Sequence, residues 1–480
     1  MATNIRAGSK TFTDFKKRFY QAFDNPEVFD CQEFNLLKVV QEGLKVQYQF
    51  RTWWGKGFWL YQIAYFFKRI TLRLSGNSNP FVPSTLASLR NRPYLILDVG
   101  RYVKTDQGTV TSPYFHAFLE SIPVADRVFG LERTHAKPQL AYDFNIQDYL
   151  PFASYLPISQ EEKELYLALT SKWKEWQQQL ELTAEEFAHI RCGLAMFWTR
   201  FRVWNYLIKQ LSPKTCFVIC HYHKEGQILA FRRQGVKIIE LQHGLIAEED
   251  IFYVYPKRIA AVASKALFAD EIWTYGQYWN EVLMKGAEYP SDRIRTIGYY
   301  QYEKSNRNHA FIQEVQSRAA GAPILLITTQ TNLYQIYIEY VQWLSKDLLD
   351  KQQAGLILVK PHPANKEGTF DILKNLPNVL VSRDDLYDLF TASDLHLSIY
   401  STTLFEATRM NLVNFALYED SCTDYVDSIL ASGVAQRIDW GQNPFDRIDT
   451  SSSQVQSENY FAPFSSWPEL LMPTPTPLES

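Results

Sequence analysis

The sequence predicts an α/β protein with two facing Rossmann-like domains behind a helical N-terminal extension. Short β-branched runs alternate with helical patterns of about 10–15 residues, as in parallel sheets. The alternation occurs in two blocks, over about 93–256 and 270–440, so each block can form one sheet with its helices. The length of 480 residues suits two to four domains.

The first expected segment, 1–90, has a helical pattern over 34–46 and 58–74. No acidic residue lies between Glu42 and Asp98, and the basic residues there interleave with Trp, Tyr and Phe. We expect 45–92 to meet an anionic membrane surface. The alternative is a core helix whose Lys and Arg reach solvent. Charges interrupt the apolar run, so a spanning helix is not expected, and neither is a signal peptide.

An N-terminal Rossmann-like domain, the acceptor domain, is expected over 91–262, and a C-terminal nucleotide-donor domain over 263–445. Residues 446–480 are rich in Ser and Pro, which predicts a disordered or loosely docked tail. Strands are expected at 93–99, 214–220, 236–241, 271–275, 293–297, 323–328, 355–359, 378–381 and 395–399, and helices within 159–211 and at 224–234, 332–347, 385–392 and 403–410.

Composition excludes several classes of protein. The net charge of −3 argues against a nucleic-acid partner, because such proteins are normally basic. Five Cys, without zinc-ligand spacing, form neither a disulfide framework nor a metal site and favour a reducing cytoplasm. The aromatic content of 15% is high. We expect part of it at a membrane face, part in the core, and part at strand ends lining a cleft, including Trp273, Tyr275, Tyr278, Trp279, Tyr299 and Tyr300.

Three polar motifs stand where strands are expected to end. The first, SIYSTTLFEA, places Ser398, Ser401, Thr402 and Thr403 before a helix that carries Glu406 in its first turns. Hydroxyls and free amides at a helix N-terminus bind anions, and a carboxylate one turn further can accept hydrogen bonds from ribose. The alternative is a capping box that only starts the helix.

The second motif, VKPHP, delivers Lys360 and His362 into the loop that follows the strand at 355–359. Both side chains donate hydrogen bonds to oxyanions, which suits phosphate binding. The alternative is a surface Lys and a loop His that is already hydrogen-bonded.

The third motif, ELQHGLI, places Gln242, His243 and Gly244 at the end of the strand at 236–241. His243 could act as a general base or contact phosphate. The acidic residues that follow could supply a base or nucleophile, since mutual repulsion separates their pKa values; the alternative is a solvated acidic loop. The acidic candidates are Asp250, Glu249 and Glu248, with Asp143, Glu120 and His116 behind them.

In this order and spacing, the motifs resemble those of bacterial GT-B glycosyltransferases and related transferases of surface-polymer assembly. That group includes capsule and O-antigen β-Kdo transferase modules, polysialyltransferases and CDP-glycerol glycerophosphotransferases. The resemblance covers about 93–420 and is carried by Gln242-His243-Gly244, Lys360-Pro361-His362-Pro363 and Ser398…Ser401-Thr402-Thr403…Glu406. Segments 272–278 and 297–299 also resemble the edges of that family's second domain, and 101–114 resembles part of its first.

The resemblance implies a GT-B fold in which His362 and the Ser/Thr run hold the donor's phosphates and Glu406 holds its ribose. Gln242, Gly244, Tyr275 and Gly298 are then expected at the cleft. The catalytic residue is expected among Asp250, Glu249 and His243. No metal or cofactor is expected, since cations and a helix dipole can stabilise a departing phosphate.

The function that follows is glycosyl transfer from a nucleotide sugar, with CMP-Kdo suggested by the resemblance, to a surface polysaccharide or glycolipid of the capsule or lipopolysaccharide O-antigen type. We expect a cytoplasmic protein, peripheral on the inner face of the plasma membrane. Two alternatives stay open: a CDP-polyol phosphotransferase of the teichoic-acid type, and a non-catalytic sugar- or lipid-binding scaffold.

Overall fold

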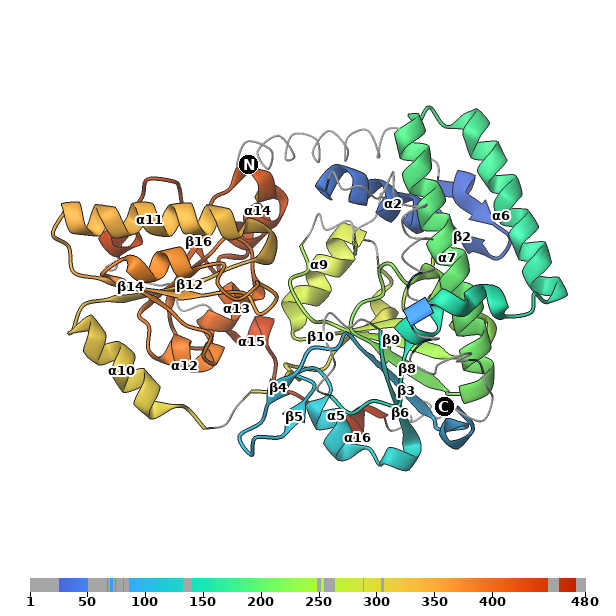
Figure 1. Cartoon of the computed structure of the whole chain (residues 1–480), viewed down its shortest axis with the longest axis horizontal. Helices are drawn as coiled ribbons and strands as arrows, with labels where there is room; N and C mark the ends of the chain where they lie inside the picture. The colour runs from blue at the N-terminus through green and yellow to red at the C-terminus, as the bar shows by residue number, and fades with distance from the viewer. Residues whose placement is uncertain are drawn as a thin grey trace, which may run out of the picture. The chain divides into compact units, whose positions relative to one another are not determined.

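The computed structural model describes residues 26–50, 86–132, 140–247, 264–287, 289–303, 306–447 and 457–471, with single residues at 67, 70, 71, 74, 81, 252 and 253. The chain is α/β with two parallel Rossmann-like sheets, a GT-B-like fold (Figure 1). It divides into two units. The seven-stranded unit contains the described residues of 10–243, 252–302 and 463–480, and the six-stranded unit contains those of 244–251 and 303–462.

The seven-stranded sheet is parallel throughout and buried at its centre. Leu95, Ile96 and Leu97 on the interior strand β3 are fully buried, as expected of a sheet covered on both faces. The chain runs from β3 outward to β6 and β7, then returns to β8 on the other side of β3. The switch point between β3 and β8 is where such sheets bind ligands. The strand order is β11 (Ile294–Thr296), β10 (Glu271–Thr274), β9 (Lys237–Leu241), β8 (Thr215–Val218), β3 (Tyr94–Asp98), β6 (Arg127–Leu131) and β7 (Phe144–Asn145).

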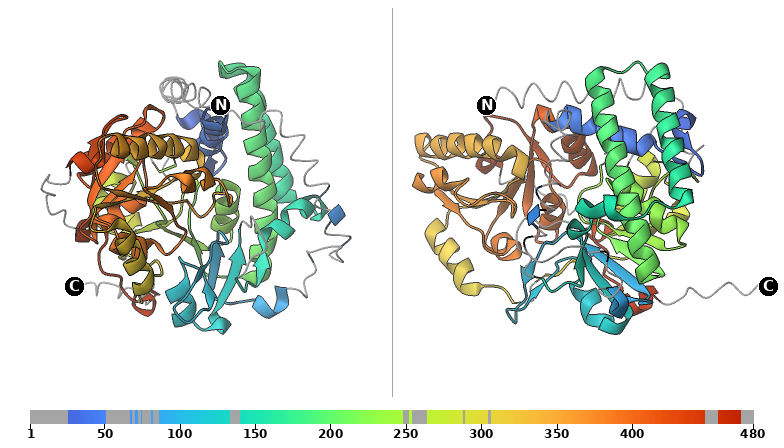
Figure 2. Two further views of the ribbon diagram at one scale, coloured as in Figure 1. Left: turned by 60° about the vertical axis from the view of Figure 1, so that its left-hand side comes forward. Right: turned by 45° about the vertical axis from the view of Figure 1, so that its right-hand side comes forward.

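Helices of this unit include a long pair, α6 (Gln160–Gln179) and α7 (Ala184–Leu211), which run side by side (Figures 1 and 2). Each starts with a capping box in which a Ser or Thr hydroxyl and a Glu carboxylate satisfy the first amides. Gly226 lets α8 cross α7 closely, because a Cβ there would lie 2.1 Å from the Phe197 carbonyl oxygen. The other helices are α2 (Leu37–Phe50), α5 (His116–Ser121), α8 (Glu225–Arg233) and α9 (Gln277–Ala287).

The six-stranded sheet is also parallel, and its switch point lies between β12 and β15. Helix α11 covers one face, and α10 and α12 cover the other (Figure 1). The strand order is β14 (Val379–Val381), β13 (Leu356–Lys360), β12 (Ile324–Thr328), β15 (Leu395–Ser398), β16 (Val413–Leu417) and β17 (Gln436–Ile438). The helices are α10 (His309–Ala319), α11 (Tyr334–Asp350), α12 (Leu386–Thr391), α13 (Thr402–Thr408) and α14 (Thr423–Ser432).

Short elements complete the described chain. Two hairpins pair β1 (Asp30–Cys31) with β2 (Phe34–Asn35) and β4 (Val103–Lys104) with β5 (Val110–Thr111). Two short helices, α15 (Ser457–Tyr460) and α16 (Trp467–Leu471), lie near the C-terminus. The 3-10 turns are Pro26–Phe29, Ala87–Leu89, Val124–Asp126, Ile146–Asp148, Leu150–Tyr155, Ser291–Arg293, Thr331–Leu333, Asp371–Asn375, Asp420–Cys422 and Pro444–Arg447.

The second domain was expected to start at residue 263, but the strand pairing places its start further along the chain, after β11. Strands β10 and β11 pair in parallel with β9 and with each other, so they extend the first sheet. The segments 272–278 and 297–299, which resemble edges of a second domain, therefore belong to the first. A strand's own sequence does not specify which sheet it joins, because both sheets need the same apolar runs.

The tail is partly a packed element rather than a loosely docked one. Trp467 in α16 is 1% exposed, and its ring centroid lies 4.8 Å from Phe118 and 5.7 Å from Phe217. Gly298 makes room for the incoming chain, because a Cβ there would lie 2.3 Å from the Pro463 carbonyl oxygen. The last residues described therefore complete the core of the seven-stranded unit.

The N-terminal segment is helical only in part. Residues 34 and 35, expected to begin the helical stretch 34–46, instead pair with residues 30 and 31 in a hairpin, and helix α2 begins at Leu37. Most of the basic aromatic stretch lies outside the described residues. Within the described residues, no helix is both long and apolar enough to cross a membrane.

Candidate functional site

The carboxyl ends of three adjacent strands meet at the switch point of the six-stranded sheet. The His362 backbone N–H, after β13, donates to Thr329 Oγ1, after β12, at 3.0 Å. Thr331 Oγ1 lies 2.9 Å from His362 Nδ1. The Gln330 side-chain amide donates to the carbonyl of Tyr400, after β15. The loops after β13 and β15 are thus joined through the loop after β12, which carries a polar run of its own.

His362 is oriented by its own loop. Its Nδ1 accepts the Ala364 backbone N–H at 3.1 Å. An imidazole nitrogen that accepts a backbone N–H is unprotonated, so the neutral ring carries its proton on Nε2. His362 therefore presents an N–H donor, as phosphate binding requires.

Lys360 is directed elsewhere. Its Nζ donates to the backbone carbonyl of Asp384. Burial lowers the pKa of Lys360, while the neighbouring Asp385 and Asp384 carboxylates act against that shift. The ammonium therefore holds the loop after β14 in place, and Lys360 contributes to the site as a nearby charge.

The Ser/Thr run mainly builds the loop. Ser398 is fully buried and donates to the Thr328 carbonyl at 2.9 Å. Ser401 caps α13 by accepting the Thr403 N–H at 3.2 Å. The hydroxyls of Thr403 and Thr328 lie 2.7 Å apart. Capping and strand bracing thus account for these three residues, whereas Thr402 is partly exposed at the helix start.

A buried histidine determines which way the hydrogen bond between the Thr328 and Thr403 hydroxyls runs. His396 is fully buried, and burial lowers its pKa to about 4, so the ring is neutral. Its Nδ1 lies 2.9 Å from Asn414 Oδ1 and must donate, so Nε2 accepts the Thr328 hydroxyl at 2.9 Å. The Thr403 hydroxyl then donates inward to Thr328 and cannot also donate to a ligand.

Glu406 lies in a network on the α12 side of β15. It is 8% exposed and accepts a hydrogen bond from the Tyr387 hydroxyl at 3.2 Å. Tyr387 also lies 2.6 Å from Glu303, which pairs with Arg409. Glu406 is thus held in position by Tyr387.

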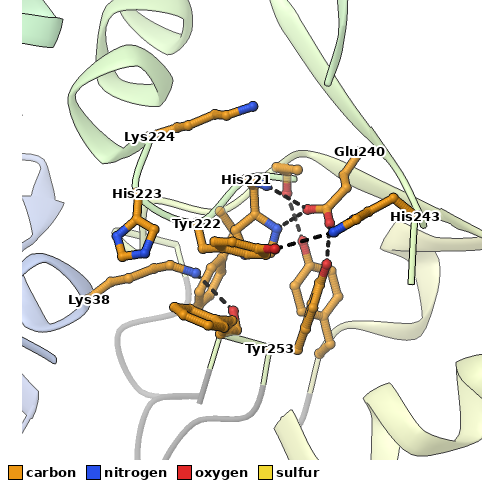
Figure 3. Close-up of polar contacts among 12 residues, drawn as sticks. Lys38, His221, Tyr222, His223, Lys224, Glu240, His243 and Tyr253 are labelled. Carbon is orange, nitrogen blue, oxygen red and sulfur yellow. Dashed lines mark hydrogen bonds and ion pairs between the residues drawn. The ribbon is translucent and has the colours of Figure 1, made fainter. Parts of the chain in front are cut away.

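The switch point of the seven-stranded sheet holds a cluster of ionisable side chains (Figure 3). His221, after β8, bonds through Nδ1 to Glu240 at the end of β9, and both are fully buried. The Tyr253 hydroxyl donates to the other oxygen of Glu240 at 2.7 Å. Burial lowers the pKa of His221, and the His221 contact lowers the pKa of Glu240 despite its burial. A neutral His221 therefore donates to an ionised Glu240.

His243 stands next to this pair. Its Nε2 lies 3.3 Å from the Tyr222 hydroxyl, and Tyr222 stacks on Phe252 with ring centroids 4.3 Å apart. Burial lowers the pKa of His243 to about 4, with Arg101 and Lys224 adding to the shift and Glu240 opposing it. The ring is therefore neutral at pH 7 and can accept a proton.

Two further acidic groups lie at the ends of β3 and β6. Asp98 is fully buried and accepts hydrogen bonds from Ser112 at 2.5 Å and the Gly100 N–H at 2.6 Å. Burial raises the pKa of Asp98 to about 6 despite these bonds. Glu132 forms a buried ion pair with Lys224 of the loop after β8.

Helix α2 also reaches this edge. Glu42 accepts the His223 backbone N–H at 2.7 Å and lies 2.8 Å from His223 Nδ1. Burial opposes ionisation of Glu42, but His223 and Lys38 lower its pKa to about 2. Burial and repulsion by Glu42 raise the pKa of Glu225, so Glu225 holds the proton of the pair.

Comparison with known proteins gives distant structural similarities only. No protein-family model matches the sequence, and no curated protein matches it. S. aureus MnaA in complex with UDP is 11% identical, with a TM-score of 0.45 over 77% of this chain and 90% of that one. UDP-GlcNAc 2-epimerase of Neisseria meningitidis, bound to UDP-GlcNAc, is 12% identical, with a TM-score of 0.43 over 78% and 94%. MurG of Acinetobacter baumannii is 11% identical, with a TM-score of 0.39 over 76% and 92%.

Several expected cleft residues are instead core residues. Gln242 is fully buried, and its side-chain oxygen accepts the Tyr275 N–H at 2.9 Å. Tyr275 is 1% exposed, and Gly298 lies under Pro463. Gly244 is partly exposed, with open space where a Cβ would stand. Of the other aromatic residues expected at the cleft, Trp273, Trp279 and Tyr300 are buried as well, whereas Tyr278 and Tyr299 are partly exposed.

The acidic candidates Glu248, Glu249 and Asp250 lie outside the described residues. Of the others, Asp143 accepts the Phe129 N–H at 2.7 Å and braces the strand edge. Glu120 lies 3.4 Å from His116 on the short helix α5. Within the described residues, no group of three or more His, Cys, Asp and Glu is arranged to hold a metal ion.

The loop after β8 and the loop after β12 were not among the site segments predicted from the sequence. The run CHYHKEG puts His221, His223, Lys224 and Glu225 directly after a predicted strand. Four ionisable groups at a strand end are a usable signal for a site. Asp98, Glu132 and Glu240 could not be found in this way, since each is a single acid at the end of an apolar run.

Proposed function

We propose that this protein is a glycosyltransferase that uses a nucleotide-activated sugar. The observation that carries the proposal is the joined set of loops after β12, β13 and β15 at the switch point of the six-stranded sheet. His362 Nε2–H and Thr402 present donors there, which suit the phosphates of a nucleotide. Glu406, close by on α13, suits a ribose hydroxyl.

In the proposed reaction, the acceptor hydroxyl oxygen forms a bond to the anomeric carbon as the carbon–oxygen bond to phosphate breaks. The departing nucleotide takes the electron pair, and the His362 N–H stabilises the negative charge that develops there. The proton of the acceptor hydroxyl passes to a base. His243, neutral and next to Tyr222, is the described candidate, and Glu249 and Asp250 are candidates outside the described residues.

For the finer identity, we propose a surface polysaccharide or glycolipid as acceptor and a cytidine nucleotide, such as CMP-Kdo, as donor. The sequence resemblance supports both. We also propose contact with an anionic membrane through 45–92. Phe67, Ile70 and Leu74 support it, being helical, 60%, 38% and 84% exposed, and spaced to share one helix face.

The direct test is isothermal titration of the full chain with CMP, CDP, UDP and GDP. We expect micromolar to millimolar binding of at least one nucleotide, and weaker binding by His362→Ala and Glu406→Ala. His309→Ala and Glu314→Ala, at exposed positions on α10, are matched controls that should bind like the parent. If none of the four nucleotides binds the parent protein, the proposal fails.

Two further measurements test the type of transfer reaction and the membrane contact. Release of CMP from a CMP-sugar supports glycosyl transfer, whereas release of CMP from a CDP-polyol indicates phosphotransfer instead. Co-sedimentation with liposomes tests the membrane contact. Pelleting with anionic but not neutral vesicles is expected, and negligible pelleting with both would remove that part of the proposal.

A further inference from the structure

A pair of stacked tyrosines flanks the loops that we assign to the donor phosphates. Tyr400 lies two residues after the end of β15, and Tyr425 lies on α14. Their ring centroids are 5.0 Å apart with an interplanar angle of 23°. Both side chains are partly exposed. The roles assigned above, namely helix capping, catalysis and phosphate binding, do not involve these two rings.

Tyr400 is held in place at three points. Its carbonyl accepts the Gln330 side-chain amide, and its hydroxyl lies 3.1 Å from the Asn332 amide nitrogen. The third contact is the stack on Tyr425. Asn332 directly follows Thr331, the partner of His362, so the fixed ring adjoins the phosphate loops. Positioning of this kind makes a ring useful for stacking, because little freedom remains to be lost on binding.

The pair lies on the α11 side of β15, away from Glu406. Tyr337 of α11 bonds to Gln330 and accepts the Ile399 N–H at 2.9 Å, which ties the start of the Tyr400 loop to that helix. Glu406 is instead tied to Tyr387 of α12. Helices α11 and α12 cover opposite faces of the sheet (Figure 1). A donor whose ribose meets Glu406 and whose phosphates meet His362 would therefore carry its transferred group toward Tyr400.

We infer that Tyr400 and Tyr425 form the subsite for the transferred group, and that this group is a cyclic sugar. A pyranose presents a flat face of C–H bonds that covers an aromatic ring, whereas an open polyol chain has no such face. This inference rests on the proposed function and deepens it, since it favours a sugar ring over the polyol of a CDP-polyol donor.

The test compares free nucleotides with nucleotide sugars by isothermal titration. The probes are CMP, UDP and GDP beside CMP-N-acetylneuraminic acid, UDP-N-acetylglucosamine, GDP-mannose and CDP-glycerol. For a ring-bearing donor that binds more tightly than its free nucleotide, Tyr400→Leu and Tyr425→Leu should each weaken binding about tenfold, a change of about 1.4 kcal/mol. Binding of the free nucleotide should change less than twofold, which also shows that the variants are folded.

Tyr400→Phe and Tyr425→Phe are the matched controls, because they keep the ring and lose only the hydroxyl. They should bind the ring-bearing donor nearly as the parent does. Equal losses for free and sugar-bearing nucleotides, no loss with any ring-bearing donor, or tighter binding of CDP-glycerol than of every sugar nucleotide would each overturn the inference. Absence of all nucleotide binding would instead overturn the proposed function.

Discussion

The orientation of His362 predicts different roles for its two ring nitrogens. Nδ1 accepts the Ala364 N–H within the loop, and Nε2 carries the proton that we assign to phosphate. His362→Asn places an oxygen near Nδ1 and keeps the loop contact, but it removes the outer donor. His362→Gln places an amide N–H near Nε2. A hydrogen bond to a charged group contributes roughly 1.5–3 kcal/mol, so Asn should weaken nucleotide binding roughly 10- to 150-fold, and Gln should retain most of the affinity.

The assay is the dissociation constant of the best-binding nucleotide, measured by isothermal titration for the parent, His362→Asn, His362→Gln and His362→Ala. Thermal unfolding of each variant checks that the loop is intact, and His309→Asn serves as a control at an exposed position. An Asn variant that binds like the parent, beside a Gln variant that binds like Ala, would refute the assignment. It would show that the imidazole acts by holding the loop.

Three other predictions follow from buried side chains. Trp467→Ala should destabilise the seven-stranded unit by about 3–5 kcal/mol in urea unfolding, because the indole is 1% exposed; a change below 1 kcal/mol would show that the tail does not pack there. His396 has a folded pKa of about 4 against 6.5 unfolded, so only the unfolded chain gains this proton as the pH falls from 6.5 toward 4. Stability should therefore drop by roughly 2.5 kcal/mol more between pH 7 and 4.5 in the parent than in His396→Leu, and equal drops would contradict this. Glu240→Gln removes a charge that raises the pKa of His243, so NMR titration of that ring should give a lower pKa than in the parent.

The local elements of the fold were largely predictable, because apolar runs and turn residues determine them. The strand expected at 355–359 is Leu356–Lys360, and the helices expected within 159–211 are α6 and α7. Strand β6 was not predicted, because its sequence RVFGL contains Gly130. A Cβ at that position would lie 2.6 Å from the Phe144 ring of β7. The glycine is therefore required by a neighbouring side chain that the sequence pattern cannot identify.

The site was predictable as a set of loops but not residue by residue. His362 was found because it follows a strand, and its tautomer became visible only through the Ala364 contact. Tyr275 and Gly298 also stand at strand ends, yet Tyr275 is 1% exposed and the returning tail lies against Gly298; composition gave no sign that Trp467 belongs to a core. Strand-end position therefore identifies candidates, while long-range packing decides which of them face solvent.

At the switch point of the seven-stranded sheet, the buried charged groups indicate a functional role for an energetic reason. Lys224–Glu132, His221–Glu240 and His223–Glu42 each join the loop after β8 to a different element. Burying an ion pair brings little net stability compared with apolar packing, while loss of one partner costs about 3–5 kcal/mol. A core selected for stability alone would not gather three buried carboxylates and their partners around one loop. Strongly perturbed ionisable groups gathered at a ligand-binding edge are typical of catalytic sites. The loop at 221–225, held by these pairs beside His243, is therefore where substitutions should be examined for loss of catalysis once a donor is known.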